Sequence, residues 1–113
     1  MAKEPKKPDS KEEQAPEYAI EFVLTDPPTI SSYGEDVHIL KLRKPTGADL
    51  IRVGNPVNFY PHLDPVKIEH DMPKVISMLA RLSGVPSSSI ERIGPTDLIG
   101  LAWAISPFFI PVA

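Results

Sequence analysis

The chain has 113 residues, with 12 basic side chains, 15 acidic side chains and no cysteine. This length allows one small domain, and the lack of cysteine excludes a disulfide scaffold, a thiolate zinc site and a cysteine nucleophile. The basic residues form no block along the sequence, so no nucleic-acid partner is expected.

The first 16 residues differ from the rest of the chain. They hold four Lys, four acidic residues and three Pro, and no apolar side chain larger than Met1. Such a segment buries too little surface to offset the entropy of ordering it, and it lacks the apolar run of a secretory signal. We therefore expect a disordered charged tail over residues 1–16 and one folded domain over residues 17–113.

Two segments near the start of this domain alternate between apolar and polar residues. Residues 18–24, YAIEFVL, place four apolar side chains on one face, and residues 37–43, VHILKLR, place Leu40 and Leu42 together. This alternation is typical of half-buried strands, and the turn-forming residues 31–36 between them predict an antiparallel hairpin. Because an isolated hairpin is marginal in water, its apolar face requires helices packed against it.

A short helix is expected over residues 48–53. Thr46 and Asp49 form a capping-box pattern, in which the carboxylate reaches back to the start of the helix. The preceding basic pair, Arg43-Lys44, allows two interpretations: a solvated strand end, or charge pairing with Asp49 or with a partner. We favour the solvated strand end, because exposed ion pairs contribute little to stability.

The middle of the chain, residues 55–71, is the hardest part to interpret. Pro56, Pro61 and Pro65 forbid a long helix, yet the segment is too apolar for a purely solvated loop. We predict a loop that packs on the body of the domain, with one helical turn after Asp64-Pro65.

The last 42 residues predict three helices separated by glycine and proline. The first covers residues 72–84, with proline in its first turn, apolar residues on one face and a glycine stop. The second starts at Pro86, and the third runs from Pro95 to Pro107. The core stripe of the third helix comprises Leu98, Leu101, Ala102 and Ile105, widened by Ile99 and Trp103. The predicted fold class is therefore α+β, an N-terminal antiparallel β-hairpin followed by three or four short helices.

Two histidine-containing clusters are candidate metal ligands. One pairs His62 with Asp64, and the other places His70 between Glu69 and Asp71. Neighbouring loop residues point in different directions, and no helical metal-binding pattern joins these residues. We interpret them as solvated residues and helix caps, and expect neither a metal nor another cofactor.

A run of three hydroxyl side chains, Ser87-Ser88-Ser89, is a candidate nucleophile. It lacks both the strand-to-helix elbow of a catalytic serine and a nearby base, so we interpret it as a helix cap. The glycines are too scattered for a phosphate-binding loop. No group of residues indicates catalysis, and we expect a protein that is not an enzyme.

The segment of greatest functional interest is LIGLAWAISPFFIPV, residues 98–112. It is shorter than the roughly 20 residues needed to span a membrane and is interrupted by proline. Two interpretations stay open: a core helix with a tucked-in tail, or a partly exposed apolar patch that meets a partner or a second copy. The small number of preceding elements favours some exposure. The candidate partner-binding residues are Leu98, Leu101, Trp103, Ile105, Phe108 and Phe109.

Several short motifs occur in a defined order along the chain. They are LKLRKPTGADL at 40–50, ARLSG at 80–84, IERI at 90–93, TDL at 96–98 and FF at 108–109. This ordered set, which covers about residues 18–109, resembles the Mu-type phage tail assembly chaperone family of contractile-tailed phages and prophages. The Pro-rich insert at residues 55–65 departs from the family pattern.

The resemblance implies a non-catalytic assembly factor in the host bacterial cytoplasm. Such a protein would coat the helical tape-measure protein before the tail tube forms, and would be shed as tube subunits polymerise. The implied partner is the tape-measure protein, with the tail tube protein and a second copy of the chain as further candidates. Exposed apolar helix faces suit this task, and shedding requires weak contacts repeated over many copies. The alternative function is that of a structural tail component retained in the virion.

Overall fold

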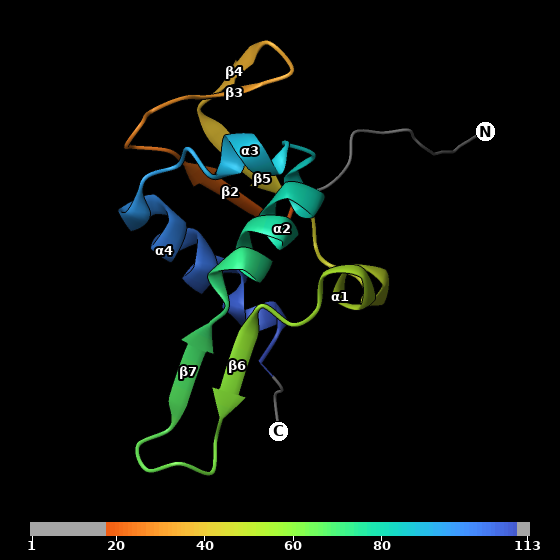
Figure 1. Ribbon diagram of the computed structural model, residues 1–113, viewed down its shortest axis with the longest axis vertical. Coiled ribbons are helices and arrows are strands. Elements are labelled where there is room, and N and C mark those ends of the chain that lie inside the picture. Colours follow the sequence, from red (N-terminus) through yellow and green to blue (C-terminus); the bar gives the residue numbers. More distant parts are fainter. Residues whose placement is uncertain (1–17, 111–113) are drawn as a thin grey trace, which may run out of the picture.

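The computed structural model describes residues 18–110, so the predicted disordered tail over residues 1–16 lies outside the described residues. The chain forms short strands first, then one helix, a further pair of strands and finally a run of helices (Figure 1). In chain order the elements are β2 (Ile20–Val23), β3 (Ile30–Ser32), β4 (Glu35–Val37), β5 (Ile39–Leu42), α1 (Gly47–Val53), β6 (Val57–Tyr60), β7 (Lys67–His70), α2 (Met72–Ser83), α3 (Ser87–Ile90), α4 (Pro95–Ile105) and the 3₁₀ turn η1 (Ser106–Phe108).

The predicted N-terminal hairpin is confirmed by the antiparallel pairing of β2 with β5. The register places Ile20 opposite Leu42 and Phe22 opposite Leu40. Leu40 and Leu42 are fully buried, as their alternation predicts. The long turn between the two strands contains a second, smaller antiparallel pair, β3 with β4. This smaller pair projects from one end of the molecule as an arm (Figure 1).

The core lies between the β2–β5 pair and the helices, so the predicted α+β class is confirmed. Helix α2 packs against β5, and α4 approaches β2 so closely that a side chain at Gly100 would meet the ring of Phe22 at 3.2 Å. Burial of this apolar surface is the main force that holds the short elements together. The fully buried apolar side chains of this core are Leu40, Leu42, Val75, Met78, Leu79, Ile90, Leu101 and Ile105.

Helix α2 has the boundaries that its sequence predicts. Asp71 caps the N-terminus by accepting a hydrogen bond from the backbone N–H of Lys74 at 3.3 Å, and Gly84 ends the helix with φ of 77°. The prediction that the serine run caps α3 is wrong. Pro86 occupies the cap position without a side-chain hydrogen bond, so Ser87–Ser89 lie inside the four-residue helix.

The prediction of a loop with a helical turn over residues 55–71 is wrong, because this segment forms a third antiparallel strand pair, a β-hairpin. Strands β6 and β7 pair antiparallel, with Val57 opposite His70 and Tyr60 opposite Lys67. The three prolines do not disturb the pairing, because Pro56 precedes the first strand and the other two lie in the connecting loop. The hairpin projects from the end of the molecule opposite β3–β4 (Figure 1).

A single buried carboxylate joins β5, α1 and α2. The predicted capping box is formed, since the backbone N–H of Thr46 donates to Asp49 Oδ2 at 2.8 Å. Arg43 donates from both terminal nitrogens to the Asp49 carboxylate at 2.8 and 2.9 Å, and Arg81 Nε donates at 2.8 Å. The interpretation of Arg43 as part of a solvated strand end was therefore wrong.

The environment of Asp49 explains why this carboxylate can be buried. Its side chain is only 1% exposed, so its charge requires partners. The hydrogen bonds from Arg43, followed by those from Thr46 and Arg81, hold the pKa of the Asp49 carboxyl well below its usual range. The carboxylate thus stays charged and fixes α1 against the body of the domain.

Candidate partner-binding surface

The start of helix α4 is clamped to the end of β2. Pro95 occupies the first turn, and Asp97 accepts hydrogen bonds from Thr25 N at 2.8 Å, Thr25 Oγ1 at 2.7 Å and Asp26 N at 3.1 Å. These bonds, those from Thr25 first, lower the pKa of Asp97. The N–H of Gly94 donates to the carbonyl of Asp26 at 2.8 Å. A Cβ at Gly94 would lie 2.3 Å from that carbonyl oxygen, so only glycine fits.

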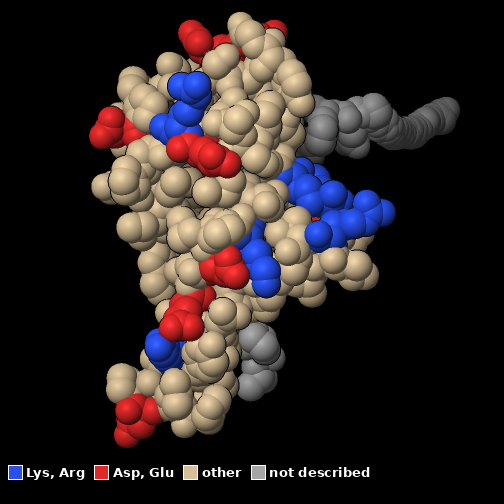
Figure 2. Space-filling model, in the orientation of Figure 1, with Lys and Arg blue, Asp and Glu red and all other residues tan. Residues whose placement is uncertain are grey.

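This clamp determines which face of α4 is exposed. Leu101 and Ile105 point into the core and are fully buried, whereas Ile99 is 53% exposed and Trp103 is 51% exposed. The prediction that Ile99 and Trp103 widen the core stripe was therefore wrong. Few charged side chains lie over α4, on the left of Figure 2. No helix between residues 18 and 110 is both long enough and apolar enough to cross a membrane.

Trp103 is held in place by the β6–β7 hairpin. Its ring meets the ring of His70 edge to face, with 4.7 Å between centroids and 81° between planes. His70 Nε2 lies 2.8 Å from Ser106 Oγ, and that hydroxyl donates to the carbonyl of Ala102 at 2.7 Å. Because the hydroxyl has only one proton, His70 Nε2 is the donor to Ser106. The indole is therefore both partly exposed and fixed in orientation.

An apolar groove lies beside the exposed face of α4. It has a volume of about 510 Å³ and is formed where the start of α2 meets the start of α4. Apart from the carboxylate of Glu91, its lining side chains are apolar. The lining residues are Met72, Glu91, Ile93, Pro95, Leu98 and Ile99. The groove and the exposed side chains of Ile99 and Trp103 together form what we call the α4 surface.

The structure divides the six candidate partner-binding residues among three places. Leu101 and Ile105 lie in the core and offer no surface to a partner in this fold. Leu98 lines the α4 groove, and Trp103 lies on the exposed face of the helix. Phe108 and Phe109 instead line a separate groove against Leu50 of α1. The η1 turn after α4 redirects the chain, and this redirection separates the two phenylalanines from Trp103.

Two exposed apolar features of the molecule, one on α4 and one on α1, were missed at the sequence level. Ile99 was placed in the core because α4 is apolar on nearly all sides, so periodicity could not distinguish the buried face from the exposed one. The exposed apolar residues Leu50 and Ile51 of α1 were not considered. The capping role of Asp49 was the available signal, because a carboxylate that faces inward places the next two residues outward.

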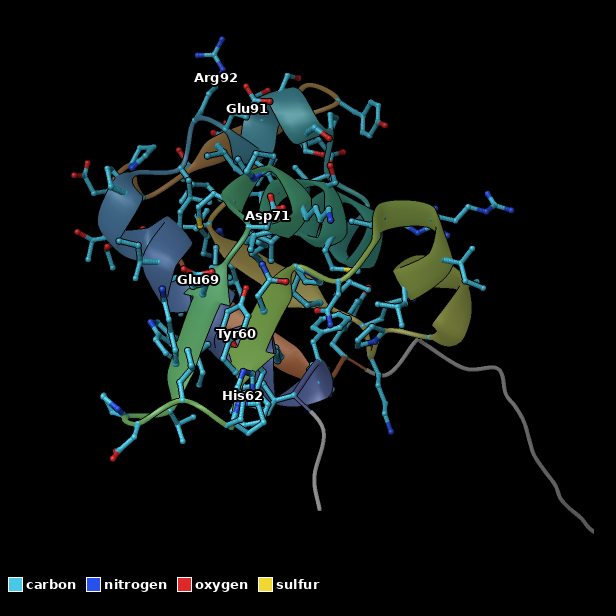
Figure 3. The ribbon with its side chains drawn as sticks, turned by 60° about the horizontal axis from the view of Figure 1, so that its bottom comes forward. Tyr60, His62, Glu69, Asp71, Glu91 and Arg92 are labelled. Carbon is cyan, nitrogen blue, oxygen red and sulfur yellow. The ribbon has the colours of Figure 1, made fainter. Side chains whose placement is uncertain are left out.

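The candidate metal ligands are engaged elsewhere or lie apart. Glu69 forms an ion pair with Lys67 at 2.9 Å, and His70 contacts Ser106. His62 lies near Tyr60 in the β6–β7 arm, away from Asp71 at the start of α2 (Figure 3). Within residues 18–110, no group of three or more His, Asp or Glu side chains is arranged to hold a metal ion.

A known protein family matches almost the whole described part of the chain. The model of the family described as phage tail assembly chaperone proteins, E, or 41 or 14, matches residues 21–110, from β2 to just beyond η1. The fold is thus that of a phage morphogenesis factor, of a class that is generally non-catalytic. The chain belongs to the phage tail assembly chaperone family, which confirms the resemblance of its ordered motifs. Neither the curated proteins nor the solved structures contain a significant match.

Proposed function

We propose that this chaperone binds the helical tape-measure protein of the tail in the host bacterial cytoplasm, and that it does so through the α4 surface. The observation that carries the proposal is the pair Ile99 and Trp103. They are four residues apart on one helix face, both about half exposed, and continuous with the apolar groove lined by Leu98.

The α4 surface has the chemistry that an amphipathic helix requires. A helix presents apolar anchors at intervals of three and four residues, and these anchors bind in apolar grooves. Trp103 is suited to be a principal contact, since tryptophan is enriched among residues that dominate binding energy. Its contact with His70 fixes the indole before binding, so little side-chain entropy is lost when the complex forms.

The modest size of the α4 surface suits a chaperone that must be released. One groove and two exposed side chains cover less area than a stable protein interface normally buries. A single contact would therefore be weak, and tight coating of a long tape-measure helix would require many copies. Polymerising tube subunits could then displace the copies one at a time. The tail tube protein is thus a further candidate partner.

The proposal is tested by co-expression with the tape-measure protein encoded by the same phage, followed by affinity capture and sizing. Trp103→Glu and Ile99→Glu should each abolish co-purification while circular dichroism shows a folded protein. Val66→Glu is the matched control, because Val66 is 55% exposed but lies in the β6–β7 connection. Absence of co-purification, with this protein present in purified virions, would instead favour the structural tail component.

A further inference from the structure

A second surface of the molecule combines apolar and basic side chains. On α1, Ile51 is 83% exposed and Leu50 is 42% exposed. The acidic residue within α1, Asp49, is buried and already paired. Figure 2 shows Lys and Arg gathered over α1 with almost no acidic surface between them, although the whole chain has a formal charge of −3. The basic residues on or beside α1 include Arg43, Lys44, Arg52 and Arg81, and Lys74 lies at its C-terminal end.

The tip of the β3–β4 arm carries an aromatic side chain in an unfavourable backbone conformation. Tyr33 and Gly34 connect the paired residues Ser32 and Glu35, and both have positive φ, 51° and 82°. A two-residue hairpin turn with two positive φ values favours Asn-Gly, and a bulky residue at the first position carries a steric cost. Tyr33 is nevertheless 83% exposed, so packing within the described fold does not offset that cost. Backbone outliers of this kind cluster at functional sites.

Acidic side chains accompany Tyr33 at this tip. Glu35 and Asp36 follow directly in β4, and both are exposed. Neither forms an ion pair with another residue of the described part of the chain. Asp36 lines the same groove as Arg92, whereas Glu35 does not line it, so Glu35 is the carboxylate more available for an external cation.

The two surfaces have complementary charge. At the arm tip an exposed aromatic ring lies beside Glu35, and on α1 an exposed aliphatic side chain lies beside Arg52. Tyr33 and Ile51 are the most exposed large hydrophobic residues of the described chain. We propose that copies of this chain associate head to tail, with the β3–β4 tip of one copy docked on α1 of the next.

The position of the two surfaces determines the kind of assembly. The β3–β4 arm and α1 project from different sides of the molecule (Figure 1). Each copy can therefore dock its own arm tip on one neighbour and receive the arm tip of another neighbour on α1. Contacts between unlike surfaces produce rings or open filaments rather than closed dimers. The association uses neither the α4 surface nor the tape-measure protein, so it is tested on the isolated full-length chain and goes beyond the proposed function.

Sedimentation equilibrium of the wild-type chain is the first test. We expect the average mass to rise with concentration and to fall when salt is raised from about 0.1 M to about 1 M, because the screening length shrinks from about 10 Å to about 3 Å. A mass that stays monomeric at millimolar concentration and low salt would overturn the proposal.

Tyr33→Asn separates folding from association. Asparagine suits the turn better than tyrosine, so the melting temperature should rise by about 3–6 °C, while association should be lost. A stabilised variant that associates like the wild type would refute a role for Tyr33. Val66→Asn in the β6–β7 connection is the matched control, and it should associate normally.

Charge reversal tests the polarity of the contact. Arg52→Glu and Glu35→Lys should each weaken association at least about tenfold, because both place like charges together. Mixing the two variants should restore assembly with alternating copies, since the intact arm tip of Arg52→Glu meets the intact α1 of Glu35→Lys and the two substituted side chains also carry opposite charges. The variant that carries both substitutions should associate again, because the two charges of the contact are exchanged and still attract each other. Failure of the mixture to associate would contradict head-to-tail pairing.

Discussion

Replacing Asp49 with asparagine tests the cluster that joins β5, α1 and α2. The substitution preserves the shape of the side chain but removes the charge that Arg43 and Arg81 contact at 2.8–2.9 Å. Removing one partner of a fully buried ion pair costs about 3–5 kcal/mol. The two arginine side chains are 39% and 37% exposed, so water solvates them after the change. We therefore expect the free energy of unfolding to fall by about 2–3 kcal/mol.

Urea unfolding followed by circular dichroism measures this loss. With an m-value of about 1.2 kcal/mol/M, the urea concentration at the midpoint should fall by about 2 M. Asp64→Asn is the control, because Asp64 is exposed in the β6–β7 connection, and its midpoint should change by less than about 0.5 M. A midpoint for Asp49→Asn within that same margin would refute the reasoning.

The stability difference between the wild type and Asp49→Asn should also depend on pH. The pKa of Asp49 is lowered in the folded state, so its contribution is present above the unfolded value, near about 3.9, and is lost as the pH falls below it. The difference in unfolding free energy between wild type and Asp49→Asn should be about 1 kcal/mol smaller at pH 3 than at pH 6. A difference that is constant over this range would mean that the charge of Asp49 is not responsible.

Three further predictions concern α4. Leu101→Ala should reduce the unfolding free energy by about 2–5 kcal/mol in urea titrations, whereas Trp103→Ala should reduce it by less than about 1.5 kcal/mol; equal losses would contradict the assigned faces. Gly94→Ala should lower the melting temperature by several degrees, because its Cβ would overlap the Asp26 carbonyl; an unchanged melting curve would argue against the clamp. Asp97→Asn should cost about 1–2 kcal/mol at pH 7 and less at pH 3, by the linkage argument used for Asp49.

Much of the fold could be predicted because its elements carry local signals. The alternation that buries Leu40 and Leu42, and the proline and glycine that bound α2, depend on neighbouring residues alone. The β6–β7 hairpin could not be predicted in this way. Its strands have four residues each, and the prolines that flank them, Pro56 and Pro61, are equally typical of a loop.

The candidate surface could not be predicted from the sequence, because it depends on contacts between distant parts of the chain. Asp97 reaches across 72 residues to Thr25, and this bond determines how α4 is rotated and whether Ile99 is buried or exposed. Likewise, the pairing of Arg43 with Asp49 required knowledge of where the strand end lies relative to α1. Sequence periodicity identifies an apolar helix, but it does not indicate which side of a uniformly apolar helix faces the core.

The most direct test of binding through the α4 surface uses the fluorescence of Trp103, the single tryptophan of the chain. A tryptophan-free helical fragment of the tape-measure protein would be titrated into the wild-type chaperone. We predict a saturable blue shift of the emission, because the half-exposed indole would be removed from water, and we predict weaker binding by Ile99→Glu. Binding that leaves the emission unchanged, or that Ile99→Glu does not weaken, would contradict the assignment of the α4 surface.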